Sequence, residues 1–118
     1  MNHAENLTEK RCKPCEGGTQ SLTKEQALEY LERVKEWQLS DDGKVIFRNF
    51  TMKNFLAAID LIKNIAAVAE NENHHPDIHL TGYRKLRIDL TTHAIGGLSE
   101  NDFIVAAKVT ALPMELKS

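Results

Sequence analysis

Histidines are the residues of this sequence whose chemistry is best suited to proton transfer. The 118-residue chain has five histidines, and four of them lie between Glu70 and Asp102. His74 and His75 stand next to each other before Pro76, and His93 follows further along the chain. A neutral imidazole accepts a proton and an imidazolium donates one, both near pH 7. This stretch is therefore the expected place for acid–base catalysis, such as an elimination that removes one proton and protonates a leaving hydroxyl.

The same residues also allow plainer interpretations. A His-His-Pro sequence after a helix can be a polar connector, and Asp102 in the first turn of a helix can complete a cap. A metal site is a further alternative, because His74, His75, His79 and His93 are enough ligands. Neighbouring residues on an extended strand point apart, so His74 and His75 are awkward ligands for one ion. We therefore predict that no metal is bound.

The first part of the domain is predicted to be a helix followed by a β-hairpin. Thr23 and Gln26 have the spacing of a capping box, and the helix is expected to run to about Glu36. Residues 37–39 and 45–50 then alternate or are rich in β-branched and aromatic side chains, and Gly43 lies in the turn between them.

A longer second helix is predicted from a cap at Thr51 to about Glu70. Its expected core face consists of Phe55, Ala58, Ile59, Ile62, Ile65, Ala66 and Ala69. Leu56, Leu61 and Val68 widen this apolar surface, so we expect a second face to be buried against a partner subunit.

Pro76 ends helical geometry and is expected to be followed by a second hairpin, with strands at residues 78–81 and 85–93. Along the latter, Leu86, Ile88, Leu90 and Thr92 should face the core, and Arg87, Asp89, Thr91 and His93 the polar side. Ser99 is expected to begin a last helix that stops before Pro113. The order helix, hairpin, helix, hairpin, helix predicts an α+β two-layer sandwich, in which three helices cover one face of a four-stranded antiparallel sheet.

Composition narrows the classes of partner. The net charge of −2 comes from interleaved acids and bases without a basic stripe, so we expect no direct binding of nucleic acid. No apolar run approaches the roughly 20 residues of a membrane helix, and the first residues lack the pattern of a signal peptide. We expect a protein without a membrane span, located in the cytoplasm.

Residues 1–21 are polar and rich in turn formers, and are predicted to be a flexible N-terminal arm that packs loosely before a domain at residues 22–118. The arm contains the Cys-x-x-Cys pair Cys12 and Cys15. This pair could be half of a zinc site, a redox pair, or spare thiols in a tight turn, and the last interpretation is favoured.

The spacing of the histidines resembles a family signature. Glu70 is followed after three positions by His74-His75-Pro76, after six more by Tyr83, after nine more by His93, and after eight more by Asp102. This pattern is similar to that of the pterin-4a-carbinolamine dehydratases, and the likeness extends over about residues 22–110.

The resemblance implies dehydration of a 4a-hydroxytetrahydropterin to the quinonoid dihydropterin, in the recycling of tetrahydrobiopterin, without a cofactor. It implies that His74, His75 and His93 are catalytic, and that Glu70, Asn73, Pro76, Thr92 and Asp102 form the pterin-binding set. Within that set, Glu70 would bind the amino-pyrimidine edge and Asp102 would orient an imidazole. It also implies a homodimer or homotetramer.

Two rival functions follow from the same resemblance. One is a non-enzymatic role as an assembly factor or as a transcriptional coactivator, which some members of the family have. The other is a different pterin reaction, for instance in molybdopterin metabolism. The complete histidine trio favours dehydration.

Overall fold

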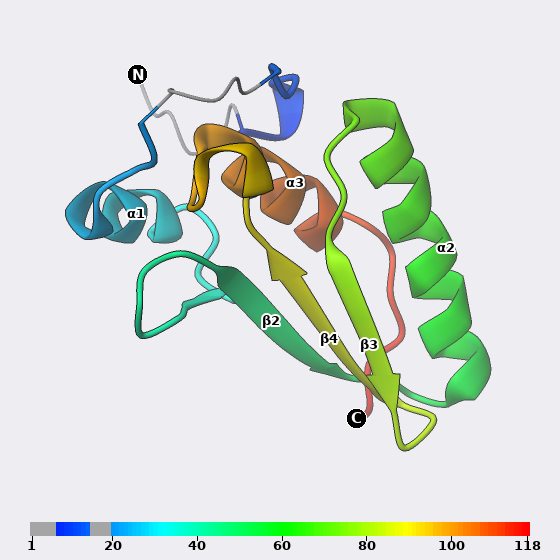
Figure 1. Cartoon of the computed structure of the whole chain (residues 1–118). Coiled ribbons are helices and arrows are strands. Elements are labelled where there is room, and N and C mark those ends of the chain that lie inside the picture. The colour runs from blue at the N-terminus through cyan, green and yellow to red at the C-terminus, as the bar shows by residue number, and fades with distance from the viewer. Residues whose placement is uncertain (1–6, 15–19) are drawn as a thin grey trace.

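A four-stranded antiparallel sheet forms one layer of the protein and helices form the other (Figure 1). The computed structural model describes residues 7–14 and 20–118. The elements in chain order are α1 (Lys24–Leu31), β1 (Gln38–Leu39), β2 (Ile46–Thr51), α2 (Phe55–Glu72), β3 (Asp77–Thr81), β4 (Lys85–Leu90), the short 3-10 helix η2 (His93–Ile95) and α3 (Glu100–Thr110). The strand order is β1-β2-β4-β3, and every neighbouring pair is antiparallel. The predicted α+β fold is confirmed.

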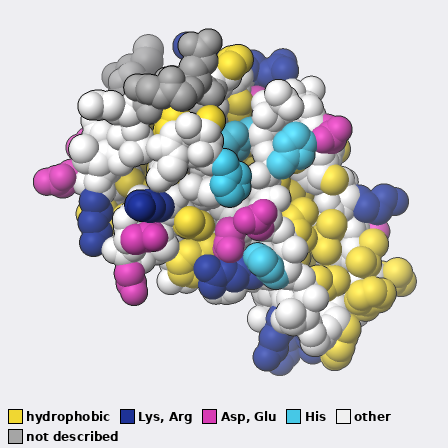
Figure 2. All heavy atoms as spheres, viewed as in Figure 1, with side chains coloured by type: hydrophobic (Ala, Val, Ile, Leu, Met, Phe, Trp, Pro, Cys, Tyr) yellow, Lys and Arg dark blue, Asp and Glu magenta, His cyan; other side chains and the backbone are white. Residues whose placement is uncertain are grey.

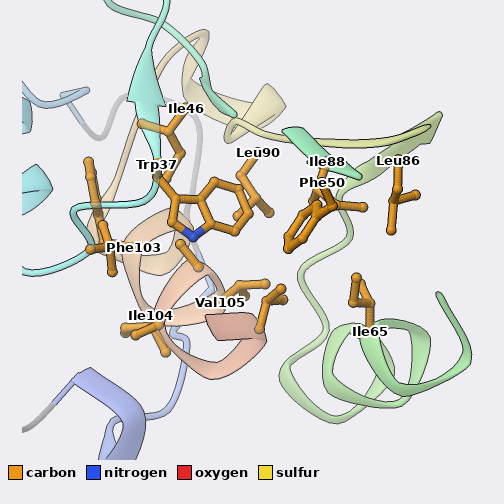
Figure 3. Close-up of a cluster of buried hydrophobic side chains, with 14 of the residues drawn as sticks. Trp37, Ile46, Phe50, Ile65, Leu86, Ile88, Leu90, Phe103, Ile104 and Val105 are labelled. Atoms are coloured by element: carbon orange, nitrogen blue, oxygen red, sulfur yellow. The ribbon is translucent and has the colours of Figure 1, made fainter. Parts of the chain in front are cut away.

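The core lies between the sheet and the helices α2 and α3. Alternate residues of β4, namely Leu86, Ile88 and Leu90, are fully buried on the helix side, as the period-two pattern predicted. In Figure 3 they lie with side chains of β2 above residues of α2 and α3. Trp37 lies within this cluster, between side chains of the sheet and of α3, and its indole nitrogen donates a hydrogen bond to Thr110 Oγ1 at 3.0 Å.

Helix α1 begins as predicted and ends earlier than predicted. Thr23 and Gln26 form the reciprocal capping box. The helix stops at Leu31 and not near Glu36, because Arg33 and Val34 donate their amides to carbonyls three residues back. This tighter winding places Val34 and Trp37 in the core.

Helix α2 differs from its prediction at both ends and in its buried face. Its N-cap is Asn54, whose side chain accepts a hydrogen bond from the Ala57 amide at 2.8 Å, whereas Thr51 is the last residue of β2 and pairs with Lys85. At the other end the helix continues past Glu70 to Glu72. The fully or largely buried positions are Ala57, Ala58, Leu61, Ile65, Ala69 and Glu72.

The predicted core face of α2 was therefore wrong at several positions. Leu61 lies in the core of its own chain, so the prediction that it faces a partner is incorrect. Phe55 and Ala66, which were expected to be buried, are exposed. Leu56 is 72% exposed beside Phe55, so this helix does present apolar surface to the outside.

Strand β4 ends three residues before the predicted boundary. Beyond it, Thr92 pairs with Gly97 across a tight loop, and Gly96 supplies the left-handed backbone conformation (φ 67°) that the loop requires. His93 consequently lies in the 3-10 helix η2 and not at the end of a strand.

The described part of the N-terminal arm does not pack loosely. Leu7 is fully buried in the core, and Lys10 forms a 2.7 Å ion pair with Glu100 at the start of α3. Loose packing was therefore a wrong prediction for residues 7–14, because their apolar and polar contacts are with segments distant in the sequence. Cys15, Gly17 and Gly18 lie outside the described residues, and the division into arm and domain stays a prediction. None of the helices described combines the length and apolar character needed to span a membrane.

Candidate functional site

The C-terminal end of α2 sets the direction of the histidine pair. Asn73 ends the helix in the left-handed conformation (φ 52°, ψ 41°), and its amide donates to the carbonyls of Ala69 and Glu70. The amide of His74 also donates to the Ala69 carbonyl, at 3.1 Å. These bonds satisfy the last carbonyls of the helix and turn the chain sharply before β3.

His74 is held by a buried carboxylate from α3. Its Nε2 lies 2.7 Å from Asp102 Oδ1, and the two side chains are 12% and 0% exposed. The other oxygen of Asp102 accepts hydrogen bonds from Thr92 Oγ1 at 2.8 Å and from the Ser99 amide at 3.0 Å. Three donors therefore fix this carboxylate, and the carboxylate fixes the imidazole.

His75 is paired with a second carboxylate in a more open setting. Its Nε2 lies 2.5 Å from Glu70 Oε2, and both side chains are more than half exposed. The two neighbouring histidines thus each have a carboxylate partner, one buried and one at the surface. An imidazole that donates one N–H to a carboxylate is oriented and keeps its other nitrogen for a ligand.

A cavity of about 590 Å³ joins these residues to the loop after β4. Five of the predicted site residues line it: Asn73, His74, His75, Thr92 and His93. Pro76, Glu70 and Asp102 are not among the lining residues, although the last two contact lining histidines. The volume of the cavity lies within the range of small-ligand sites, about 300–1,000 Å³. In Figure 2, histidine side chains gather on the face of the molecule that is turned to the viewer.

His79 does not belong to this cavity. It lies on β3 opposite Arg87, and its Nε2 is 3.5 Å from Asp89 on the sheet. In the part of the chain that the structure describes, no three His, Cys, Asp or Glu side chains are grouped as a metal site would require. The expectation that function needs no metal stays a prediction.

The cavity also has walls that the sequence interpretation missed. They include Glu72, Asn101 and residues 11–14 of the arm. One signal was available for Glu72: it continues the buried stripe of Leu61, Ile65 and Ala69 at helical spacing, and a buried acid needs partners. No comparable local pattern marks the arm.

Cys12 lies in this wall as a protonated thiol. Burial, together with the nearby carboxylate of Glu72, raises its pKa to about 12. The thiol is 3.6 Å from the carbonyl oxygen of Asn101, to which it donates. At neutral pH Cys12 is therefore a poor nucleophile, because the thiolate is the reactive form.

The sequence matches a known family over most of the domain. Residues 20–112 fit the family model described as pterin 4 alpha carbinolamine dehydratase. The chain belongs to the pterin-4a-carbinolamine dehydratase family. A protein of Halorhodospira halophila whose name assigns it to the same family is 47% identical, over 90% of this chain and 96% of the relative. The mitochondrial pterin-4-alpha-carbinolamine dehydratase 2 of Arabidopsis thaliana is 40% identical, over 92% of this chain and 60% of that protein.

Solved structures agree with this membership of the pterin-4a-carbinolamine dehydratase family. A protein of Brucella melitensis described as a transcriptional coactivator/pterin dehydratase superposes with a TM-score of 0.72 at 32% identity, covering 77% of this chain and 96% of that one. A pterin dehydratase-like protein described as a RuBisCO assembly factor of the α-carboxysome has a TM-score of 0.55 at 22% identity, covering 64% of this chain and 87% of that one. The latter shares the fold.

Proposed function

We propose that the protein dehydrates 4a-hydroxytetrahydropterin to the quinonoid dihydropterin by histidine acid–base catalysis. The observation that carries the proposal is the meeting of His74, His75 and His93 at one cavity, with carboxylates behind the first two. The names of the relatives favour the same activity.

The reaction needs one proton delivered and one removed. The C4a–O bond breaks as an acid protonates the hydroxyl, which leaves as water. A base takes the N5 proton, and the electron pair of the N–H bond forms the C4a=N5 double bond. Imidazoles suit both duties near neutral pH, and positioned acid or base catalysis contributes about 10²–10⁴ in rate.

Each histidine has a distinct place in this scheme. His74 donates its Nε2–H to the buried carboxylate of Asp102, which leaves Nδ1 as the nitrogen with a lone pair. His75 shares a proton with Glu70 at the surface, so it can recover a proton from solvent after each cycle. His93 lines the cavity from the opposite loop. The acid and base duties belong to this trio as a coupled set.

The binding set predicted from the signature is part of the proposal. Asn73 and Thr92 line the cavity directly, and Pro76 ends the turn that carries the two histidines. Glu70 points to His75, so its proposed contact with the amino-pyrimidine edge requires that the pair opens or is shared. Asp102 serves through His74 as an orienting group.

The proposed physiological setting is tetrahydrobiopterin recycling in the cytoplasm by a homodimer or homotetramer. A coactivator role is the second candidate, because the Brucella protein is described by both words. The test is a dehydratase assay in which an aromatic amino acid hydroxylase generates the 4a-hydroxytetrahydropterin. Acceleration of its decay supports the proposal, and a rate equal to the spontaneous one refutes it.

A further inference from the structure

Residues 11–14, called here the arm wall, form one side of the cavity that holds the histidines. The histidine signature begins at Glu70 and does not include them. We propose that the arm wall positions the pterin, and that Glu72 and Asn101 are positioning residues that lock this wall in place. The proposal rests on the proposed function, since it names a further part of the same site.

Glu72 is the first lock. Its side chain is 0% exposed, and its Oε1 accepts a hydrogen bond from the backbone amide of Cys12 at 2.8 Å. Its Oε2 accepts one from Lys108 Nζ at 2.6 Å, and Arg11 Nε lies 3.5 Å away. Burial by itself would raise the pKa of Glu72, but the hydrogen bonds from Lys108 and Cys12 and the two cations outweigh it and lower that pKa. Glu72 therefore holds the arm wall as a carboxylate.

Asn101 is the second lock. Its Oδ1 accepts a hydrogen bond from the Lys13 amide at 3.0 Å, and its Nδ2 donates to the Lys13 carbonyl at 2.5 Å. The residue is 7% exposed and stands next to Asp102, the partner of His74. Glu72 likewise lies two positions before His74. The chain segments that fix His74 therefore also fix the arm wall.

The placement of these locks indicates a role beyond stability. Leu7 anchors the arm in the core, as expected of a segment that stabilises the fold. Arg11, Lys13 and Pro14, in contrast, are exposed, yet the backbone of this segment is held at Cys12 and Lys13 by the buried polar groups of Glu72 and Asn101. A wall that is rigid before binding spares the ligand the free-energy cost of ordering it. This explains why buried polar groups are directed at an exposed segment.

Two substitutions test the contacts of Glu72 and those of Asn101 separately. Glu72→Gln replaces one of the two accepting oxygens by an NH₂ group, so either Lys108 or the Cys12 amide loses its acceptor. Asn101→Ala removes both bonds to Lys13 and leaves every charge in place. The matched control is Glu115→Gln, which removes the exposed ion pair with Lys53, and neither of these residues lines the cavity.

The measurements are amide hydrogen exchange at Cys12 and Lys13, titration with 7,8-dihydrobiopterin as a stable pterin, and steady-state dehydration kinetics. We expect faster exchange in both variants and a Kd and KM raised roughly five- to fiftyfold, as the loss of one or two buried hydrogen bonds gives. The kcat should stay within about threefold, since the groups that transfer protons are unchanged. The control should match wild type in all three measurements.

Two results would overturn the proposal. One is faster exchange with wild-type Kd and KM, which means that the pterin does not contact the arm wall. The other is unchanged exchange in both variants, which means that these residues do not hold it. If neither variant folds, Arg11→Ala replaces them in the test, because the Arg11 side chain is 69% exposed. A raised Kd of this variant for 7,8-dihydrobiopterin would support the proposal, and a wild-type Kd would overturn it. If the wild-type protein binds the pterin but does not dehydrate 4a-hydroxytetrahydropterin, the proposed function is refuted. The role of the arm wall in binding can then still be judged from the Kd values of the variants.

Discussion

Replacing Asp102 by asparagine tests whether the buried carboxylate sets the protonation of His74. The carboxylate has one oxygen toward His74 and the other toward the Thr92 hydroxyl and the Ser99 amide. An amide N–H can only donate, so the Ser99 amide requires that the single oxygen of the substituted side chain faces it. The new NH₂ group then faces His74 Nε2, which must lose its hydrogen to accept the bond. The hydrogen moves to Nδ1, the nitrogen that carries the lone pair when Nε2–H donates to the carboxylate.

The size of the effect follows from this exchange of donors. If His74 keeps its hydrogen on Nε2 in the variant, this N–H and the new side-chain NH₂ group at position 102 are two donors that face each other. Little water can reach them, because the His74 side chain is only 12% exposed. An unsatisfied buried donor costs about 1–3 kcal/mol, which is roughly five- to 150-fold in rate. We expect kcat/KM to fall by roughly 10- to 100-fold, with a folded protein by circular dichroism.

The assay combines kinetics with ¹⁵N NMR of the imidazole nitrogens, which reports the tautomer of His74 directly. Ser99→Ala is the matched control, because it removes a hydroxyl bonded to Thr92 Oγ1 and keeps the Ser99 amide that bonds Asp102. Its kcat/KM should stay within about threefold of wild type, less than about 0.7 kcal/mol. An Asp102→Asn variant with wild-type kcat/KM, or with His74 still protonated on Nε2, would refute the reasoning.

Three further predictions concern metal, assembly and acid stability. Activity should be unchanged after treatment with a chelator, because imidazoles suffice for both proton transfers; loss that one added metal restores would contradict this. Leu56→Glu should shift a homo-oligomer toward smaller species in light scattering, because Leu56 is 72% exposed on α2 beside Phe55; a wild-type monomer at tens of micromolar would defeat the prediction. The lowered pKa of Glu72 stabilises the fold above the ordinary glutamate pKa of about 4.3, and this stabilisation is lost as the pH falls through the pKa of Glu72 in the folded protein. The free energy of unfolding, measured by urea titration, should therefore fall less steeply toward acid pH in Glu72→Gln than in wild type. An equally steep fall in the variant would contradict this prediction.

Much of the fold was readable from local patterns. The alternation along β4 placed Leu86, Ile88 and Leu90 in the core, and the capping box at Thr23 fixed the start of α1. Both depend on neighbours in the chain, as does the turn before Pro76 that presents the histidine pair. The resemblance to the family implied that His74, His75 and His93 share one site, and all three line the same cavity.

The errors fall where long-range contacts decide. Thr51 and Asn54 are both good caps, and the pairing of Thr51 with Lys85 across the sheet leaves the role to Asn54. The burial of Leu61 likewise depends on how α2 is rotated against the sheet and α3, which its wide apolar surface does not specify.

The same reason explains the missed parts of the site. The contact of Cys12 with Glu72 and that of Lys13 with Asn101 join segments 60 and 88 residues apart. The turn-forming composition of the arm predicted loose packing because it records local preference and no distant partner.

Dehydration of a 4a-hydroxytetrahydropterin by the histidine trio can be measured directly. The measurement is the decay of this compound, generated by an aromatic amino acid hydroxylase, with wild-type protein and with His75→Ala and His93→Ala, singly and combined. We expect that wild type accelerates the decay and that each single variant loses about 10²–10⁴ of that acceleration while remaining folded. A double variant that dehydrates the pterin at the wild-type rate would contradict the proposed function.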